Sequence, residues 1–341
     1  MRLVLLGNPC VEHVGSHFRE AASELRVETV FVDVRTAFGG SYVRRKVDWW
    51  LRGRRPSRLG DMTSQLVRLC REQRPDLLFT VGIGPITGAG IDEIRSLGVE
   101  CANYLTDDPW NPAHRAPWFM EALPRYDAVF SPRRSNIPDL VAAGCRKVEY
   151  LPFAYAPHLH FPEAVGEEER LRLKSDIVFA GGCDRDRVPY IGALRKAGFR
   201  IALYGGYWDR FSETQGLSRG LADPGEIRKA MGAAKVGLCL VRRQNRDGHS
   251  MRTFEVPACG TCALVEWTEE HEELFGRDGE AVLYFDSVQE MIGKAQWLLS
   301  NDGERQRLAA SARTLLAGGG HAYRDRLRFI LKSVGVKSSA G

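Results

Sequence analysis

Short apolar runs alternate with amphipathic stretches along most of this chain. In the first half the runs are RLVLLG, ETVFVDV, DLLFTVG, VECANYL, DAVFSP and KVEYLPF, with segments such as HFREAASEL and DMTSQLVRLCREQ between them. Buried parallel strands are continuous apolar runs, and the helices that connect them are amphipathic. The alternation therefore predicts an α/β fold built from parallel strands and crossover helices.

A second series of apolar runs follows a connector at residues 153–174, which is first proline-rich and then charged. This series is DIVFAGG, FRIALYGG, KVGLCLV, CALVEW and EAVLYFD. We therefore expect two Rossmann-like domains, at residues 1–155 and 175–318, that face a central cleft holding the ligand. Residues 319–341 are expected to form a C-terminal helix that can cross back to the N-terminal domain.

The composition fits an ordinary globular protein, with 44 % hydrophobic and 27 % charged residues. The formal net charge of +5 suits an anionic small ligand as well as nucleic acid, and it favours neither strongly. The N-terminal apolar run of four residues is too short for a signal peptide, and no run approaches a membrane span. We therefore expect a cytoplasmic protein. Its eight cysteines lie mostly in apolar contexts typical of reduced core residues.

The stretch DGHSMRTFEVPACGTC, residues 247–262, carries the strongest functional pattern. It follows the predicted strand KVGLCLV and a polar loop, and its MRTFEVPACG portion predicts a helix. The start of a helix offers unpaired N–H groups and a positive dipole end to a diphosphate. The predicted donor-binding residues here are Gly248, His249, Ser250, Arg252, Thr253 and Glu255.

The Cys-x-x-Cys at the end of this stretch has a spacing that also occurs in zinc sites and in redox motifs. A structural zinc site needs four ligands, and no second cysteine pair or nearby histidine pair stands at a suitable spacing. A redox motif favours its first cysteine at a helix N-terminus, whereas Cys259 is expected near the helix end. We therefore favour a packing role for both Cys259 and Cys262.

The segment GGCDRDR follows the predicted strand DIVFA. Gly181 and Gly182 predict a turn near the ligand, and Arg185 and Arg187 are candidates for binding phosphate. Its Asp-x-Asp could instead hold a divalent metal, or the loop could be solvated without a function. We expect no metal and no cofactor besides the donor substrate.

In the first half, Asp107 and Asp108 follow the predicted strand VECANYL. Paired carboxylates can position a hydroxyl or share a proton, although they can also begin a turn ahead of a proline. Asp107, Asp108 and His17 are therefore candidate catalytic residues. Gly7 and Asn8, after the first strand, are candidates for contacting an acceptor.

Residues 44–58, RRKVDWWLRGRRPSR, carry seven basic side chains and one acid around two tryptophans. Such a segment suits the surface of a membrane or an anionic acceptor, and also nucleic acid. An exposed helix whose tryptophans pack on the domain would have the same sequence pattern. Peripheral contact with the inner membrane face is thus one expectation, and we expect no nucleic-acid partner.

The stretch from Arg252 to Leu331 resembles the C-terminal half of the CgeB-like, spore-maturation-type glycosyltransferases. The residues that carry the resemblance are Arg-Thr-Phe-Glu, Ala-Cys-Gly, Glu-Leu-Phe and a late His with Tyr and Arg; YLTDDPWN and VEYLPFAYAPHLH resemble the same group. This group is related to the retaining glycosyltransferases of family 4, group 1, which have the GT-B fold.

The resemblance implies a metal-independent, retaining transfer of a sugar from a nucleoside diphosphate sugar to an acceptor hydroxyl. The acceptor would be a glycan, a lipid-linked molecule or a small molecule. In the related enzymes two glutamates eight residues apart bind the sugar and the ribose. The resemblance therefore implies that Glu255 is the ribose ligand and that Asp247, at the sugar-binding position, is a further candidate catalytic residue, although aspartate is a departure there. Leu221 or its neighbours would lie near the base. A non-catalytic protein that binds nucleotide sugars is the alternative.

Overall fold

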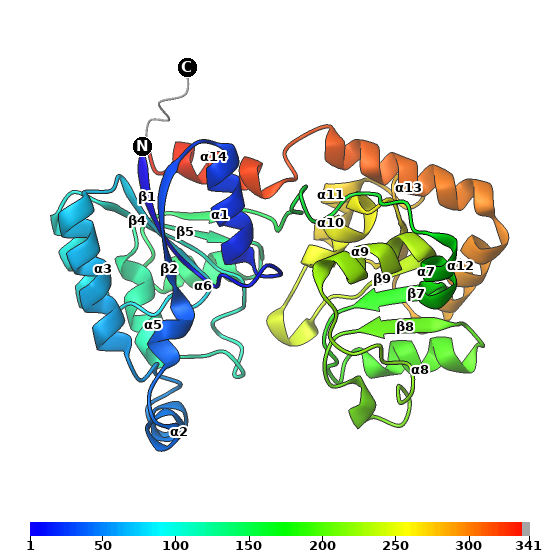
Figure 1. Cartoon of the computed structure of the whole chain (residues 1–341), viewed down its shortest axis with the longest axis horizontal. Helices are drawn as coiled ribbons and strands as arrows, with labels where there is room; N and C mark the ends of the chain where they lie inside the picture. The colour runs from blue at the N-terminus through cyan, green and yellow to red at the C-terminus, as the bar shows by residue number, and fades with distance from the viewer. Residues whose placement is uncertain (336–341) are drawn as a thin grey trace. The chain divides into compact units, whose positions relative to one another are not determined.

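The computed structural model describes residues 1–335 and divides into two compact units (Figure 1). Unit 1 comprises Met1–Pro152, Gln244–Arg246 and the C-terminal residues from Tyr323, and unit 2 comprises Phe153–Arg243 and Asp247–Ala322. Each unit contains one parallel sheet with helices on both faces. The predicted fold class, two Rossmann-like domains with C-terminal helices, is therefore confirmed.

Unit 1 holds a six-stranded parallel sheet in the order β2-β1-β3-β4-β5-β6. Its strands are β1 (Arg2–Gly7), β2 (Glu28–Asp33), β3 (Leu77–Val81), β4 (Glu100–Tyr104), β5 (Ala128–Ser131) and β6 (Val148–Tyr150). Its helices are α1 (Val14–Glu24), α2 (Tyr42–Leu51), α3 (Leu59–Gln73), α4 (Gly88–Ser96), α5 (Pro117–Ala122), α6 (Asn136–Ala142) and α14 (Tyr323–Ser333), with 3₁₀ turns η1 (Val34–Phe38) and η2 (Leu123–Arg125).

Two cores form because successive strand residues point to opposite faces of the unit 1 sheet. On one face, strand residues such as Leu6 and Leu78 pack with side chains of α3, α4 and α5. On the other face, the ring of Phe18 from α1 lies 5.0 Å from that of Phe79 and 5.2 Å from that of Tyr323. Helix α14 thus lies beside α1, as Figure 1 shows in red and blue.

Unit 2 holds a five-stranded parallel sheet in the order β11-β10-β9-β7-β8. Its strands are β7 (Ser175–Ala180), β8 (Ile201–Tyr204), β9 (Ala234–Cys239), β10 (Cys262–Glu266) and β11 (Leu283–Phe285). Its helices are α7 (Glu167–Leu173), α8 (Val188–Lys196), α9 (Pro224–Ala233), α10 (Met251–Ala258), α11 (Glu269–Phe275), α12 (Val288–Ser300) and α13 (Asp302–Ala317), with the 3₁₀ turn η3 (Trp208–Arg210); the turn η4 (Arg243–Asn245) begins in unit 2 and ends in unit 1.

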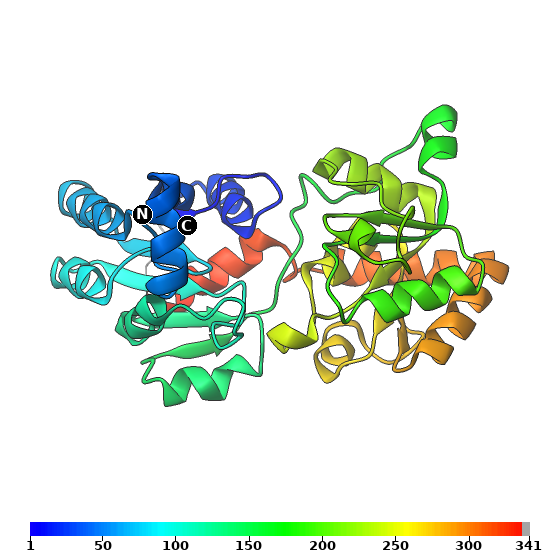
Figure 2. The same cartoon turned by 90° about the horizontal axis from the view of Figure 1, so that it is seen from below.

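Helices α8 and α12 contribute to a core on one face of the unit 2 sheet, and Figure 2 shows α9 on the opposite face from α8. Helix α10 packs so closely on β9 that a Cβ added at Gly237 would lie 2.3 Å from Val256 Cγ1. In each sheet the strand that comes first in the sequence lies between the next two: β1 lies between β2 and β3, and β7 lies between β8 and β9. The chain therefore crosses from this strand to one side of the sheet and later to the other side. Ligands of such sheets bind outside the strand carboxyl ends at this switch point.

The strands predicted from apolar runs are all present, and so are the predicted helices near residues 17–25, 61–73 and 251–258. The helix expected within residues 319–341 is α14, Tyr323–Ser333, and residues 336–341 lie outside the described part of the chain. The connector at 153–174 contains the short helix α7, which lies in its charged part and was not predicted. Within residues 1–335, none of the helices combines the length and apolar character needed to span a bilayer.

Candidate functional site

Helix α10 begins at Met251 with Ser250 as its extended N-cap residue, as predicted. The Ser250 amide donates to Thr253 Oγ1 at 3.3 Å, which pairs one of the N–H groups at the helix start. Helix α10 lies between β9 and β10 in the sequence, and because these two strands are parallel its start lies at the carboxyl ends of the strands of unit 2. This is the switch-point position at which α/β sheets bind ligands.

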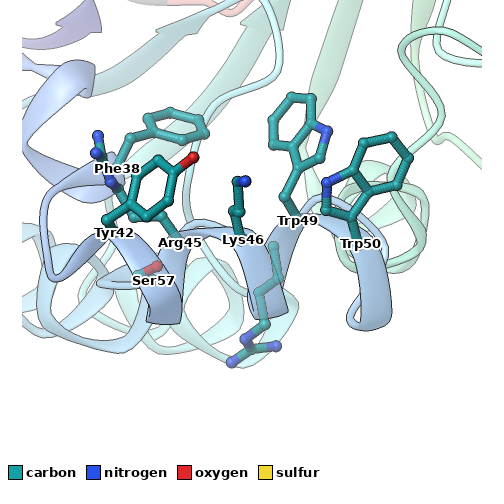
Figure 3. Close-up of a pocket in the computed structure, with 8 residues that line it drawn as sticks. Phe38, Tyr42, Arg45, Lys46, Trp49, Trp50 and Ser57 are labelled. Carbon is teal, nitrogen blue, oxygen red and sulfur yellow. The ribbon is translucent and has the colours of Figure 1, made fainter.

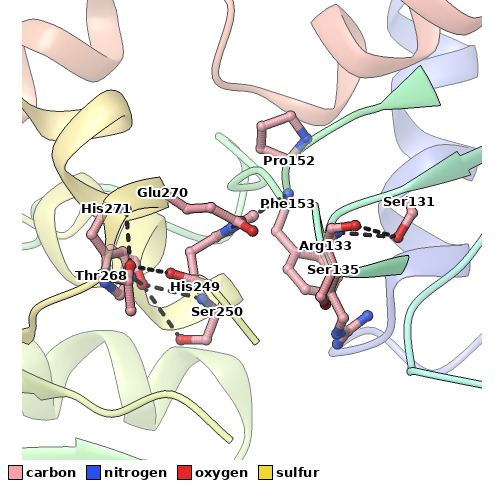
Figure 4. A network of polar contacts seen from close by, with 12 residues as sticks. Ser131, Arg133, Ser135, Pro152, Phe153, His249, Ser250, Thr268, Glu270 and His271 are labelled. Carbon is pink, nitrogen blue, oxygen red and sulfur yellow. Dashed lines mark hydrogen bonds and ion pairs between the residues drawn. The ribbon is translucent and has the colours of Figure 1, made fainter. Parts of the chain in front are cut away.

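His271 of α11, labelled in Figure 4, fixes the orientation of the Thr253 hydroxyl. Its Nδ1 lies 2.8 Å from the Glu266 carbonyl, which can only accept, so Nδ1 carries the proton and Nε2 accepts from Thr253 at 3.0 Å. Burial, and secondly the nearby His249, lower the pKa of His271 to about 3. The ring is therefore neutral at ordinary pH and Thr253 has its partner inside the protein.

Gly248 and His249 are held by residues at the start of the same helix, α11. Figure 4 shows His249 beside Glu270 of that helix. His249 is fully buried; its Nδ1 lies 2.7 Å from Glu270 Oε2, and its Nε2 accepts from the Phe153 amide at 3.0 Å. The Gly248 carbonyl accepts from Thr268, and a Cβ added at Gly248 would lie 2.1 Å from Glu270 Cδ. The structure thus gives these predicted donor-binding residues a role in holding the start of α10.

Glu255 and Arg252 form an ion pair one turn into α10. Glu255 is 2 % exposed, and Arg252 also donates from Nε to the Ala180 carbonyl at the end of β7, at 2.8 Å. His160 Nδ1 accepts from the Ala156 amide, so in the neutral ring Nε2 carries the proton, and it lies 3.8 Å from Glu255 Oε1. Arg252 and His160 thus orient a buried carboxylate near the carboxyl end of β7.

The arginines of the loop after β7 differ in accessibility. Arg187 donates to the Gly182 carbonyl at 3.0 Å and the Leu240 carbonyl at 3.5 Å, and it pairs with Asp184 at 3.4 Å. Its side chain is 8 % exposed, and burial lowers its pKa. Arg187 therefore ties the ends of β7 and β9 together, and Arg185 is the exposed guanidinium of the predicted pair.

Gly181 and Asp247 lie near these strand ends, whereas Leu221 is 87 % exposed in the loop before α9. The Gly181 amide donates to the Tyr204 carbonyl at 2.7 Å, which aligns the loop with β8. Asp247 is partly exposed, eight residues before Glu255, and its amide donates to the Arg242 carbonyl at 3.3 Å. Arg242, whose Nε lies 3.6 Å from Asp184 Oδ2, is a basic residue that the sequence pattern did not single out.

In unit 1, Asp108 is 1 % exposed and accepts two hydrogen bonds from Arg246, at 2.6 and 3.0 Å. It also accepts from the Trp110 amide and the Asn136 amide group, each at 3.0 Å. Hydrogen bonding to Asp108 is the main cause that raises the pKa of Arg246. The carboxylate of Asp108 thus has a structural ion pair that its sequence context did not reveal.

Asp107 is the more accessible member of the pair, with 34 % of its side chain exposed. Its Oδ1 lies 3.3 Å from Asn245 Nδ2 and 3.6 Å from His114 Nε2. His17 is instead 2 % exposed, with its ring 4.9 Å from that of Tyr323. Among the predicted catalytic residues of unit 1, Asp107 has the geometry best suited to meeting a substrate.

Gly7 and Asn8 form the turn between β1 and α1. A Cβ added at Gly7 would lie 2.9 Å from Gly15 Cα, so this turn needs glycine for the close approach of the helix to the strand. Asn8 Oδ1 accepts from the Cys10 amide at 3.0 Å. The two residues lie at the carboxyl end of β1, the switch point of the unit 1 sheet.

All eight cysteines are free, and Cys259 and Cys262 are buried. Burial raises the pKa of both thiols to about 12, which disfavours the thiolate that redox and zinc chemistry use. Within residues 1–335, no group of three or more His, Cys, Asp or Glu side chains is placed to hold a metal ion. Cys262 packs in the core of the unit 2 sheet, and a packing role for both cysteines stays our prediction.

Comparison with known sequences places one similarity in the C-terminal half. Residues 187–332 match a family described as "Glycosyl transferase-like". No curated protein is similar enough in sequence to count as a match.

Solved structures resemble the whole chain in fold. Sucrose-phosphate synthase from Thermosynechococcus elongatus has a TM-score of 0.71 at 12 % identity, over 98 % of this chain and 99 % of its own. A glycosyltransferase from Rickettsia africae has a TM-score of 0.67 at 9 % identity, with 98 % and 99 % covered. HepE from Anabaena, in complex with UDP-glucose, has a TM-score of 0.66 at 11 % identity, with 98 % and 100 % covered. The chain thus has the GT-B fold of these structures, with a glycosyl transferase-like sequence over residues 187–332.

Proposed function

We propose that this protein is a glycosyltransferase that moves a sugar from a nucleoside diphosphate sugar to an acceptor hydroxyl. The observation that carries the proposal is the glycosyl transferase-like sequence of residues 187–332, which includes the start of α10 at the switch point of its sheet. A helix start suits a diphosphate, and a fixed carboxylate nearby suits the hydroxyls of ribose or sugar. The UDP-glucose in the HepE structure supports a nucleotide sugar as the donor.

In this proposal unit 2 binds the donor. Glu255 accepts hydrogen bonds from the ribose hydroxyls, since its carboxylate is already oriented by Arg252 and His160. The accessible arginine of the loop after β7, Arg185, and the partly exposed Arg252 supply positive charge to the diphosphate. Asp247 takes the position that contacts the transferred sugar.

Charge that develops on the departing diphosphate is stabilised by the start of α10 and by arginine, without a metal ion. Because no metal ion takes part in this proposal, chelation by EDTA should leave the rate of donor consumption unchanged. The proposal also includes retention of the anomeric configuration, which the CgeB-like resemblance implies. We assign Asp107, Gly7 and Asn8 to the acceptor side, because they are at or near the strand carboxyl ends of unit 1.

The alternative is a protein that binds nucleotide sugars without turnover. A thermal-shift screen with UDP, GDP and dTDP should identify the nucleotide, because a ligand that binds the folded state raises its apparent stability. Consumption of the matching sugar nucleotides is then measured with and without candidate acceptors. Binding without consumption of any donor would favour the alternative. Conversion of the donor into an isomeric sugar nucleotide, with no sugar transferred to an acceptor, would contradict the transferase proposal.

A further inference from the structure

Helix α2 of unit 1 presents an unusual number of apolar side chains to solvent. Trp50 is 77 % exposed, Leu51 81 %, Val43 70 % and Tyr42 63 %. Figure 3 shows the rings of Tyr42, Trp49 and Trp50 on one side of the helix. Scattered exposed apolar residues are common, but a contiguous cluster marks an interaction surface. The alternative in which both tryptophans pack on the domain is therefore wrong for Trp50.

The charged side chains of this helix and of the residues that follow it are mostly basic. Residues 44–58 contain seven basic residues and one acid, Asp48. Asp48 is 2 % exposed and is accompanied by Arg44 at 3.7 Å and Arg52 at 3.2 Å, so its negative charge is turned inward and compensated. Lys46 remains exposed, with Nζ 4.6 Å from the centre of the Tyr42 ring.

An open pocket of about 270 Å³ lies along this helix, lined by aromatic rings and basic side chains (Figure 3). Its lining includes Phe38, Tyr42, Arg45, Lys46, Trp49 and Trp50. Aromatic rings next to ammonium and guanidinium groups suit the boundary between lipid headgroups and acyl chains, where one end of a side chain is wet and the other apolar.

We propose that α2 and the residues around it, 38–58, bind the surface of a bilayer that contains anionic phospholipid. A helix of this kind lies in the plane of the interface, with aromatic and aliphatic groups at the acyl boundary and basic groups on the phosphates. Nucleic acid would use the rings for stacking, but it would leave the aliphatic side chains of Val43 and Leu51 in water. These two are among the most exposed apolar residues here, so they favour a bilayer.

The experiment is flotation of the full-length protein with two kinds of vesicle. One kind is pure phosphatidylcholine, and the other is an equimolar mixture of phosphatidylcholine and phosphatidylglycerol. We expect binding to the mixed vesicles at least about tenfold tighter than to the neutral ones, weakened by added salt. Both the W50S/L51S double variant and Lys46→Glu should weaken binding by about fivefold or more. Because these side chains are exposed, both variants should unfold at the wild-type temperature.

Two substitutions on unit 2 serve as matched controls. Trp297→Ser removes a 43 % exposed tryptophan from α12, and Arg313→Glu reverses an exposed charge on α13. Both should bind vesicles as the wild type does. Equal binding to the two kinds of vesicle, or full binding by the α2 variants, would overturn the proposal. So would binding of a single-stranded oligonucleotide that the α2 substitutions abolish, if the vesicles are not bound. No donor or turnover enters the assay, so its outcome is independent of the proposed function.

Discussion

The Glu255 carboxylate is paired with Arg252 on the preceding turn of α10, and that arginine also donates to the Ala180 carbonyl at the end of β7. Glu255 is thus held in one orientation before any ligand binds. A preorganised carboxylate binds hydroxyl groups more tightly than a mobile one, because little side-chain entropy is lost on binding. This geometry makes the role of Glu255 testable at the level of a single hydroxyl.

We expect Glu255→Gln to weaken binding of the preferred nucleoside diphosphate by about ten- to a hundredfold, the range for a lost hydrogen bond to a charged group. The 2′-deoxy form of the same nucleotide should bind the wild type more weakly, yet bind the variant about as well as the ribose form does. Isothermal titration calorimetry with both ligands measures the four affinities.

Cys262→Ala is the matched control for the same segment, since Cys262 is buried at the start of β10 and its role is packing. Its affinity and donor turnover should stay close to those of the wild type. Unchanged discrimination between ribose and 2′-deoxyribose in Glu255→Gln would contradict the ribose assignment, even if overall affinity fell.

The neutral, buried ring of His271 makes stability depend on pH. Its pKa in the folded protein is about 3 and its ordinary value is 6.5, so between these values the unfolded chain binds a proton that the folded protein does not. The free energy of unfolding therefore falls as pH is lowered from about 6.5 toward 3, by up to about 1.4 kcal/mol for each pH unit from this one group.

His271→Asn should be less stable than the wild type at pH 7, because the Thr253 hydroxyl loses its acceptor. Its stability should also depend less steeply on pH below 6.5. Urea unfolding at pH 7 and pH 5 measures both effects, and His158→Asn, at an exposed histidine, should keep the wild-type dependence. Parallel pH profiles for wild type and His271→Asn would contradict a neutral His271.

Asp107 and Asp108 are adjacent in sequence but are expected to respond differently to substitution. Asp108→Asn removes the charge that pairs with Arg246 in a buried setting, so it should lower the free energy of unfolding by about 2–4 kcal/mol. Asp107→Asn affects longer, exposed contacts and should change it by less than about 1 kcal/mol. Thermal and urea unfolding of the two variants check this.

For activity, the substitution at Asp107 is expected to have the specific effect, although it is the one that changes stability less. If Asp107 meets the acceptor, Asp107→Asn should lower kcat for transfer by at least about tenfold while the nucleotide affinity and the unfolding temperature stay unchanged. A fully active Asp107→Asn enzyme would remove Asp107 from the candidate catalytic residues.

The strands and the start of α10 could be predicted because their signals are local. An apolar run predicts a buried strand, and a polar loop before MRTFEVPA predicts a helix start, whatever the rest of the chain does. The partners of Asp108 and His249 could not be predicted in this way. Arg246 is 138 residues from Asp108, and Glu270 of α11 is 21 residues from His249, which lies in the loop before α10. Only the assembled sheets bring these groups together.

Thr253 and His249 were predicted to contact the donor because their polarity is visible in the sequence and their burial is not. Polar residues near a helix start suit a ligand and an internal hydrogen bond equally well, and their burial decides between the two. Both side chains are fully buried in the structure and have protein partners. Arg252 remains partly exposed, which is why it stays in the proposed donor site.

Gly248 tests whether the start of α10 must keep its place. Gly248→Ala would bring a Cβ to 2.1 Å from the Glu270 carboxyl carbon, so either that carboxyl or the backbone before α10 has to move. Moving the carboxyl weakens its hydrogen bond to the buried His249, and moving the backbone shifts the N–H groups of the helix start. We expect a loss of about 1–3 kcal/mol in stability and at least about tenfold weaker nucleotide binding.

Gly303→Ala on α13, where an added Cβ meets nothing within 4 Å, is the matched control and should leave binding unchanged and stabilise the helix slightly. Wild-type affinity in Gly248→Ala would mean that the diphosphate does not depend on the position of this turn, and the donor would then have to bind elsewhere in unit 2.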